Sequence, residues 1–91
     1  MKQQKQVLVL ARRDHTEAMR VASGLTIFGH GVRLVFMHRP VEETDENAAQ
    51  LETLELCDIE PETTVDGQGL PVLSGGELSL ALVEADCVLS L

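Results

Sequence analysis

Residues 7–35 constrain the fold of this chain more than any other segment, because apolar and amphipathic patterns alternate along them. An apolar run at residues 7–11 leads into a polar turn, an amphipathic stretch and a Gly-His-Gly break, after which a second apolar run begins at Val32. This order is typical of a strand, a helix and a second strand joined as a crossover. Such a unit pairs its strands in parallel, so the segment predicts a parallel sheet with a helix packed on it.

Polar residues and glycines mark the ends of the helix in this crossover. Asp14 can accept a hydrogen bond from the first helical turn, and Glu17 stands at the reciprocal position of a capping box. Gly29 and Gly31 supply backbone conformations that end a helix. The helical spacing of five apolar residues predicts the buried face and leaves Met19 outside it; the five are Ala18, Val21, Ala22, Leu25 and Phe28.

The rest of the chain repeats the alternation of strands and helices. The patterns predict a strand at residues 32–37, a helix at 42–57, a short edge strand at 63–66, a helix that starts with a capping box at Ser74 and Glu77, and a last strand at 87–91. We therefore expect an α/β fold, a small three-layer sandwich with a mostly parallel sheet of about four to five strands and helices on both faces. The 91 residues are expected to form a single domain.

Charge is divided unevenly along the chain. All 7 Lys and Arg residues lie within residues 1–40, and the formal net charge is −8. Two of the 15 acidic residues, Asp14 and Glu17, lie in the same part, so residues 41–91 hold the other 13 and no Lys or Arg. This balance argues against direct binding of nucleic acid, which requires positive charge. The division favours different partners for the two parts, or it reflects acidic helices that keep a small protein in solution.

The sequence has neither the pattern of a membrane protein nor that of a secreted one. The polar lead-in at residues 1–6 lacks the apolar core of a secretory signal, and no apolar run approaches the length that spans a bilayer. Two cysteines, Cys57 and Cys87, are too few for a disulfide scaffold. We therefore expect a cytoplasmic protein with reduced thiols and no membrane partner.

The residues best suited to binding follow the predicted strands. Ligands collect beyond the carboxyl ends of parallel strands, where helix N-termini add positive potential. The first two strands end in a basic rim, and the third helix opens with a second candidate for anion binding; the residues are Arg12, Arg13, His15, His38 and Arg39 at the rim, and Ser74, Gly75 and Gly76 at the helix. The pattern predicts a small-anion site. The alternative is that the arginines are solvated and pair with the acidic half.

The cysteines and glycines indicate little further chemistry. Cys57 falls near the end of a helix beside Glu55 and Asp58, where the helix dipole and like charges disfavour a thiolate. Cys87 begins an apolar strand and is expected in the core. No spacing of Cys and His residues fits a zinc site, and no glycine-containing loop fits a dinucleotide or Walker site. We expect neither a metal nor a cofactor.

Two segments of the chain resemble the DsrE/DsrF-like family, which includes the TusD-type sulfur-relay proteins. They are the run EAMRVASGLTIFGHGVRLVF at residues 17–36 and the run LVEADCVLSL at residues 82–91. The resemblance implies a DsrE-like domain over residues 1–91, a small α/β sandwich that assembles into homo-oligomers or hetero-oligomers. It also implies a relation to sulfur transfer, in which active members carry sulfur as a cysteine persulfide.

The chain departs from the active members of this family at one position. Their sulfur-carrying cysteine lies in the loop after the third strand, and the corresponding window, residues 65–74, contains no cysteine. The leading hypothesis is therefore a non-catalytic DsrE-like subunit or binding module, associated with intracellular sulfur transfer and with DsrE-like subunits as partners. Two alternatives stay open: a sulfur carrier or sulfurtransferase that uses Cys57, and a module that binds a small anion or nucleotide at the rim of residues 12–15. Whether the chain is an enzyme is left open.

Overall fold

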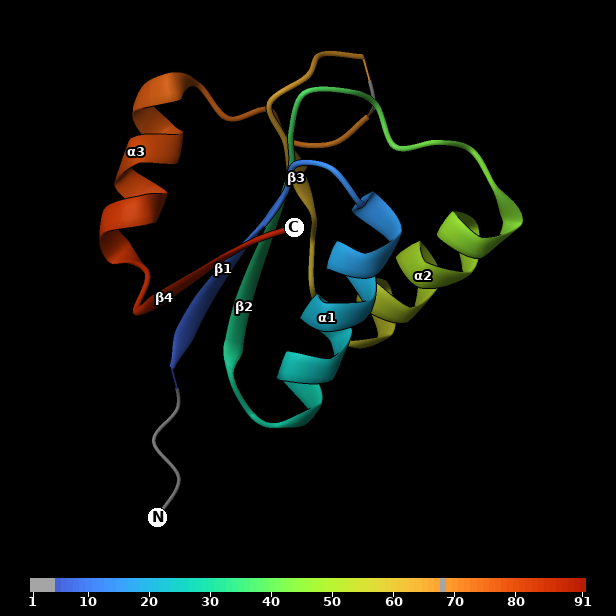
Figure 1. Ribbon diagram of the computed structural model, residues 1–91, viewed down its shortest axis with the longest axis horizontal. Helices are drawn as coiled ribbons and strands as arrows, with labels where there is room; N and C mark the ends of the chain where they lie inside the picture. Colours follow the sequence, from blue (N-terminus) through green and yellow to red (C-terminus); the bar gives the residue numbers. More distant parts are fainter. Residues whose placement is uncertain (1–4, 68) are drawn as a thin grey trace.

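The computed structural model describes residues 5–67 and 69–91, and the chain forms three layers around one sheet (Figure 1). The strands are β1 (Gln6–Ala11), β2 (Gly31–Phe36), β3 (Glu62–Thr63) and β4 (Cys87–Ser90), and the helices are α1 (His15–Ile27), α2 (Asp45–Leu56) and α3 (Gly75–Glu84). All four strands are parallel, in the order β3-β2-β1-β4. Figure 1 shows α1 and α2 on one side of the sheet and α3 on the other. The predicted α/β sandwich is confirmed.

Strand β1 lies between two neighbours and is covered on both faces, which explains its apolar sequence. Val7, Val9 and Ala11 belong to the core under α1 and α2. Leu8 and Leu10 belong to the core under α3. Because alternate residues of a strand face opposite sides of the sheet, a strand buried on both sides needs an apolar residue at every position.

Side-chain caps fix where α1 and α3 begin. The Asp14 carboxylate accepts a hydrogen bond from the Glu17 N–H at 3.0 Å, as the sequence predicts. The Glu17 carboxylate, however, accepts from the Arg20 guanidinium at 2.9 Å instead of forming the reciprocal half of a capping box. At α3 both halves form: the Glu77 N–H donates to Ser74 Oγ at 3.1 Å, and the Ser74 N–H donates to Glu77 Oε1 at 3.0 Å. These bonds satisfy N–H groups that have no partner within the helix.

The buried face of α1 differs from the predicted one. Met19 is fully buried, although the sequence places it outside that face. Phe28 is exposed, because α1 ends at Ile27 and Phe28 is its C-cap residue. The helix packs against α2 as well as against β1 and β2, so residues that turn toward α2 are buried too. The buried residues of α1 are His15, Ala18, Met19, Ala22 and Ser23.

The later elements confirm the predicted order but not all of its boundaries. The edge position of β3 is confirmed, but the strand covers Glu62–Thr63 rather than residues 63–66, because only these two residues pair with β2. Helix α2 begins at Asp45 rather than at residue 42. The core prediction for Cys87 is wrong: this cysteine is exposed, because it begins β4, the strand at the other edge of the sheet.

Some predicted features reach beyond the described residues. Residues 1–4 of the polar lead-in predicted at residues 1–6 lie outside the described part of the chain, and so does Gln68 of the sequence window 65–74. Within the described part of the chain, no helix combines the length and the apolar character needed to cross a membrane.

Two leucines on α2 test whether the core lies where we describe it. Leu54 is 0% exposed and Leu56 is 82% exposed, so the same substitution removes the same atoms from opposite environments. We expect Leu54→Ala to lower the free energy of unfolding by about 2–5 kcal/mol, because it leaves a cavity in the core. Leu56→Ala should change it by less than about 0.5 kcal/mol. Urea titration followed by circular dichroism measures both, and equal losses would contradict this core.

Candidate functional site

The turn after β1 and the loop after β2 are joined at the carboxyl rim of the sheet. The Met37 N–H donates to the Ala11 carbonyl at 3.0 Å, which extends the pairing of β1 and β2 beyond the strands. His15 Nε2 lies 3.3 Å from the Met37 carbonyl oxygen. The Arg39 guanidinium donates to the Arg13 carbonyl. As the sequence predicts for adjacent parallel strands, the two segments therefore meet at one rim.

A tight turn at His38 directs Arg39 toward the turn after β1. The φ angle of His38 is 72°, and the Arg39 N–H donates to the Met37 carbonyl at 2.9 Å. A bond between residues two apart, with a positive φ between them, defines the rare and strained form of the γ-turn. Strained residues of this kind persist where the surrounding contacts hold them, and they concentrate at ligand and active sites.

His15 is a buried part of this rim rather than a solvent-facing histidine. Its ring packs against that of Phe36, with the ring centroids 5.2 Å apart. Burial lowers the pKa of His15 below its ordinary value of 6.5, and the nearby Arg39 charge lowers it further. The contact with the Met37 carbonyl opposes this shift. The ring is therefore neutral near pH 7, and it supports the rim without adding charge.

A cavity of about 350 Å³ lies between the joined segments. The described residues that line it are Arg13, Asp14, His15, Thr16, Arg39, Glu42 and Asn47. Three of the five predicted rim residues therefore come together here, whereas Arg12 and His38 are exposed outside the lining. The lining residues include two arginines and two acidic residues. One of the carboxylates, Asp14, is occupied as the cap of α1.

The backbone of the turn after β1 is already occupied. The Leu91 carbonyl accepts hydrogen bonds from the N–H groups of Arg12, Arg13 and Asp14, at 3.1, 2.8 and 3.3 Å. Three converging N–H groups are the arrangement that binds anions in protein loops. Here the three N–H groups bind Leu91, the residue that follows β4. A ligand in the cavity therefore has to be recognised through side chains.

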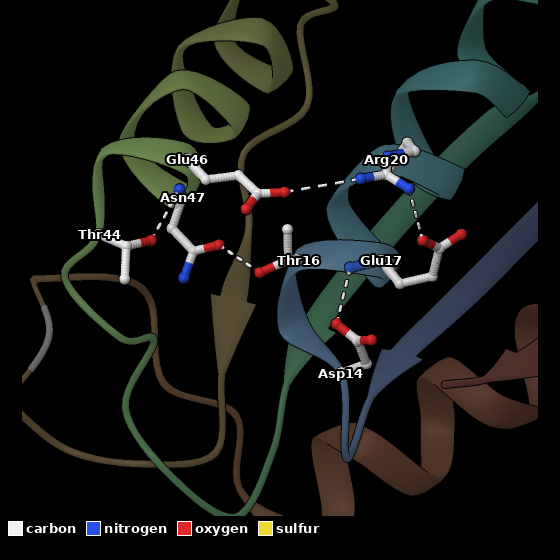
Figure 2. A network of polar contacts seen from close by, with 7 residues as sticks. All are labelled: Asp14, Thr16, Glu17, Arg20, Thr44, Glu46 and Asn47. Atoms are coloured by element: carbon white, nitrogen blue, oxygen red, sulfur yellow. Dashed lines mark hydrogen bonds and ion pairs between the residues drawn. The ribbon is translucent and has the colours of Figure 1, made fainter.

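Asn47 is central to the rim, although the sequence reading did not single it out as a site residue. Figure 2 shows its side chain pointing at Thr16, whose hydroxyl donates to Asn47 Oδ1 at 2.5 Å. Asn47 Nδ2 donates to the Glu42 carbonyl at 2.8 Å, and the Asn47 N–H donates to Thr44 Oγ1 at 3.1 Å. This buried amide thus ties α1 to the start of α2. Its sequence signal is local: an asparagine three residues after a threonine N-cap.

An ion-pair cluster supports the same helix contact from the solvent side. In Figure 2, Arg20 on α1 lies between Glu17 of its own helix and Glu46 of α2. The nitrogen–oxygen distances are 2.9 and 3.6 Å; the side chains of Arg20 and Glu46 are largely exposed and that of Glu17 is partly exposed. Exposed pairs contribute little stability. The buried Asn47 bonds therefore matter more for the geometry of the cavity.

The second predicted anion site is separate from this cavity. Ser74, Gly75 and Gly76 open α3 on the other face of the sheet, and none of them is among the described lining residues. The Ser74 hydroxyl already accepts the Glu77 N–H. An anion bound there would therefore occupy a site of its own, apart from the cavity that Arg13 and Arg39 line.

Both thiols lie near the amino ends of the strands, opposite the rim. Cys57 is the C-cap residue of α2, which runs back from the carboxyl end of β2 to the start of β3. Cys87 is the first residue of β4 and pairs with Val7 near the start of β1. Neither cysteine is in a disulfide. A nucleophile at either position would work far from the arginines of the cavity.

The other cavity at this rim has the wrong charge for an anion. It has a volume of about 560 Å³, and its described lining includes the carboxylates of Glu42, Glu43, Asp45 and Asp66. These residues repel an anion, which favours the smaller cavity beside Arg13 and Arg39. Across residues 5–67 and 69–91, no cluster of three or more His, Cys, Asp or Glu side chains is arranged to hold a metal ion.

The lowered pKa of His15 makes stability depend on pH in a defined direction. Since the folded pKa lies below the unfolded value of 6.5, the stabilisation is complete above pH 6.5 and is lost as the pH falls from there toward the folded pKa. Urea midpoints at about pH 7.5 and about pH 5.5 should differ less in His15→Gln than in the wild type. His38→Asn, which tolerates a positive φ, should keep the full difference. An unchanged difference in His15→Gln would contradict a buried neutral ring.

The Asn47 bonds predict a cost in stability. We expect Asn47→Ala to lower the free energy of unfolding by about 1–3 kcal/mol, because it removes the partners of the Thr16 hydroxyl and the Glu42 carbonyl. Glu52→Ala, on an exposed position of the same helix, should change it by less than about 0.5 kcal/mol. Chemical denaturation measures both changes in the free energy of unfolding. Equal changes would contradict a stabilising role for the Asn47 side-chain bonds.

Comparisons with known proteins found no family model, no curated protein and no solved structure that matches this chain.

Proposed function

We propose that this chain is a non-catalytic binding subunit that holds a small oxyanion at the carboxyl rim of its sheet. The proposal is supported by the separation of the arginines from the thiols. Arg13 and Arg39 both line the 350 Å³ cavity at the carboxyl ends of the strands, whereas Cys57 and Cys87 lie near the amino ends. The rim thus has the groups that recognise an anion and lacks the thiol that would react with one.

The two arginines supply the binding groups. Within the described residues, neither Arg13 nor Arg39 lies in ion-pair distance of a carboxylate. Arg39 uses one nitrogen to reach the Arg13 carbonyl, which fixes the position of its guanidinium and leaves its other N–H groups for a ligand. A fixed guanidinium presents paired donors that match the oxygens of an oxyanion. Charge-assisted bonds of this kind are the strong ones.

The relation to sulfur transfer comes from the resemblance of residues 17–36 and 82–91 to DsrE-like proteins. Without a cysteine in residues 65–74, sulfur cannot be held at this rim as a persulfide. It would instead be bound as an anion, such as thiosulfate or sulfite, beside a subunit that supplies the reactive cysteine. The proposed role is therefore that of an intracellular partner subunit in a DsrE-like assembly.

Calorimetric titration with thiosulfate, sulfite and a nucleotide monophosphate tests the anion site. We expect an oxyanion to bind, and Arg13→Ala or Arg39→Ala to weaken its affinity by about tenfold or more, since each variant removes a charge-assisted interaction. Arg20→Ala is the matched control, because this exposed arginine of α1 pairs with Glu17 and Glu46 away from the cavity. Its affinity should equal that of the wild type.

Two outcomes would contradict the proposal. Equal affinities in the three arginine variants would show that the cavity is not the site, and preferred binding of the nucleotide would favour the alternative ligand. Persulfide formation on Cys57 or Cys87 during incubation with a sulfur donor, detected by mass spectrometry of the alkylated chain, would overturn the non-catalytic role.

A further inference from the structure

The two edges of the sheet are treated differently by the chain. At the β3 edge, the Thr63 N–H donates to the Pro71 carbonyl at 3.0 Å and the Leu73 N–H donates to the Thr63 carbonyl at 2.8 Å. Residues 71–73 therefore cover this edge. At the β4 edge, no segment within residues 5–67 and 69–91 pairs with the outer side of the strand. An uncovered edge is a template for pairing with another strand.

Two residues of β4 direct their backbone groups outward. The Leu91 N–H donates to the Leu10 carbonyl, and the Leu91 carbonyl accepts the Arg12 N–H, so Leu91 faces β1 with both groups. Sides alternate along a strand, so Leu89 faces β1 as well. Val88 and Ser90 consequently turn their N–H and C=O groups away from β1, toward the open edge.

An apolar surface continues from this edge onto α3. Val88 is 41% exposed, and β4 contains no charged residue and no proline of the kind that normally protects an edge. On α3, Ala81 packs against the sheet, and Glu84 lines a small cavity beside Arg33 of β2. At roughly 100° per residue, Leu82 lies on the opposite flank of Ala81 from Glu84, toward β4. Leu82 is exposed too.

Charge along β4 favours one orientation of a second copy. The strand begins after the exposed carboxylate of Asp86, which also accepts the Gln6 N–H. It ends beside Arg12, which is exposed and whose N–H donates to the Leu91 carbonyl. An antiparallel copy places the acidic start of each strand against the basic end of the other, twice by symmetry. A parallel copy would place like charges together.

We propose that two copies of this chain pair their β4 strands antiparallel around a twofold axis at Leu89. Val88 then faces the partner's Ser90, so that every outward N–H and C=O group of the two residues has a partner. Leu82 packs beside the joined strands, and the two sheets become one. This dimer specifies a partner for the subunit role and rests on the proposed function only in expecting an assembly. It uses no residue that lines the anion cavity.

Molar mass in solution tests the dimer on the full chain. Light scattering over a dilution series should give twice the monomer mass of 9.9 kDa at high concentration. Val88→Lys should raise the concentration at half dissociation by about tenfold or more, since the charge is introduced twice into the paired edge. Val72→Lys is the control, because Val72 is 44% exposed and lies at the covered β3 edge. It should leave the dimer intact.

Hydrogen exchange of the unsubstituted chain gives a second measurement, which does not require that a variant folds correctly. The amides of Val88 and Ser90 should gain protection as concentration rises, whereas that of Leu89 should be protected throughout. A monomer at all concentrations would overturn the proposal, and so would a dimer that Val88→Lys leaves unchanged. Unchanged anion affinity in Val88→Lys would show that anion binding does not depend on dimer formation.

Discussion

The central strand β1 is the constraint on which the rest of this structure depends. It pairs with β2 on one side and with β4 on the other, and both of its faces are buried. The carboxyl end of β1 also positions the rim: the Ala11 carbonyl accepts the Met37 N–H, and the next three N–H groups bind the Leu91 carbonyl. Strand order, helix layers and site therefore share one origin, a strand that is apolar at every position from Val7 to Ala11.

The rim shows how a small chain fixes a cavity with few contacts. Arg39 reaches back to the Arg13 carbonyl, and the strained turn at His38 gives it that direction. Asn47 joins α1 to the loop before α2 through its side-chain amide. A neutral His15 fills the space beneath these groups, because burial lowers its pKa. Arg13 and Arg39 thus line the cavity within a framework whose polar groups are paired, which would lower the cost of ordering them around the proposed anion.

Long apolar and amphipathic patterns in the sequence are sufficient to predict the fold. They do not predict contacts between residues that are far apart in the chain. Apolar runs and caps predict the layers, and the basic residues that follow the first two strands predict the rim. They do not predict that Leu91 occupies the N–H groups of the β1 turn, because that contact joins residues far apart in the chain. The prediction for Met19 is wrong because helix periodicity alone does not reveal that α1 also packs against α2. Cys87 is misplaced because an apolar run does not show which strand lies at an edge.

We propose that this chain binds its ligand at the carboxyl rim and not at either thiol. Nuclear magnetic resonance of the isotope-labelled chain during a thiosulfate titration tests this proposal. We expect chemical shifts to change at residues 13–16 and 38–42 and at the side-chain N–H groups of Arg13 and Arg39. The signals of Cys57 and Cys87 should stay in place. Changes centred on the two cysteines, with the rim unaffected, would contradict binding at the rim.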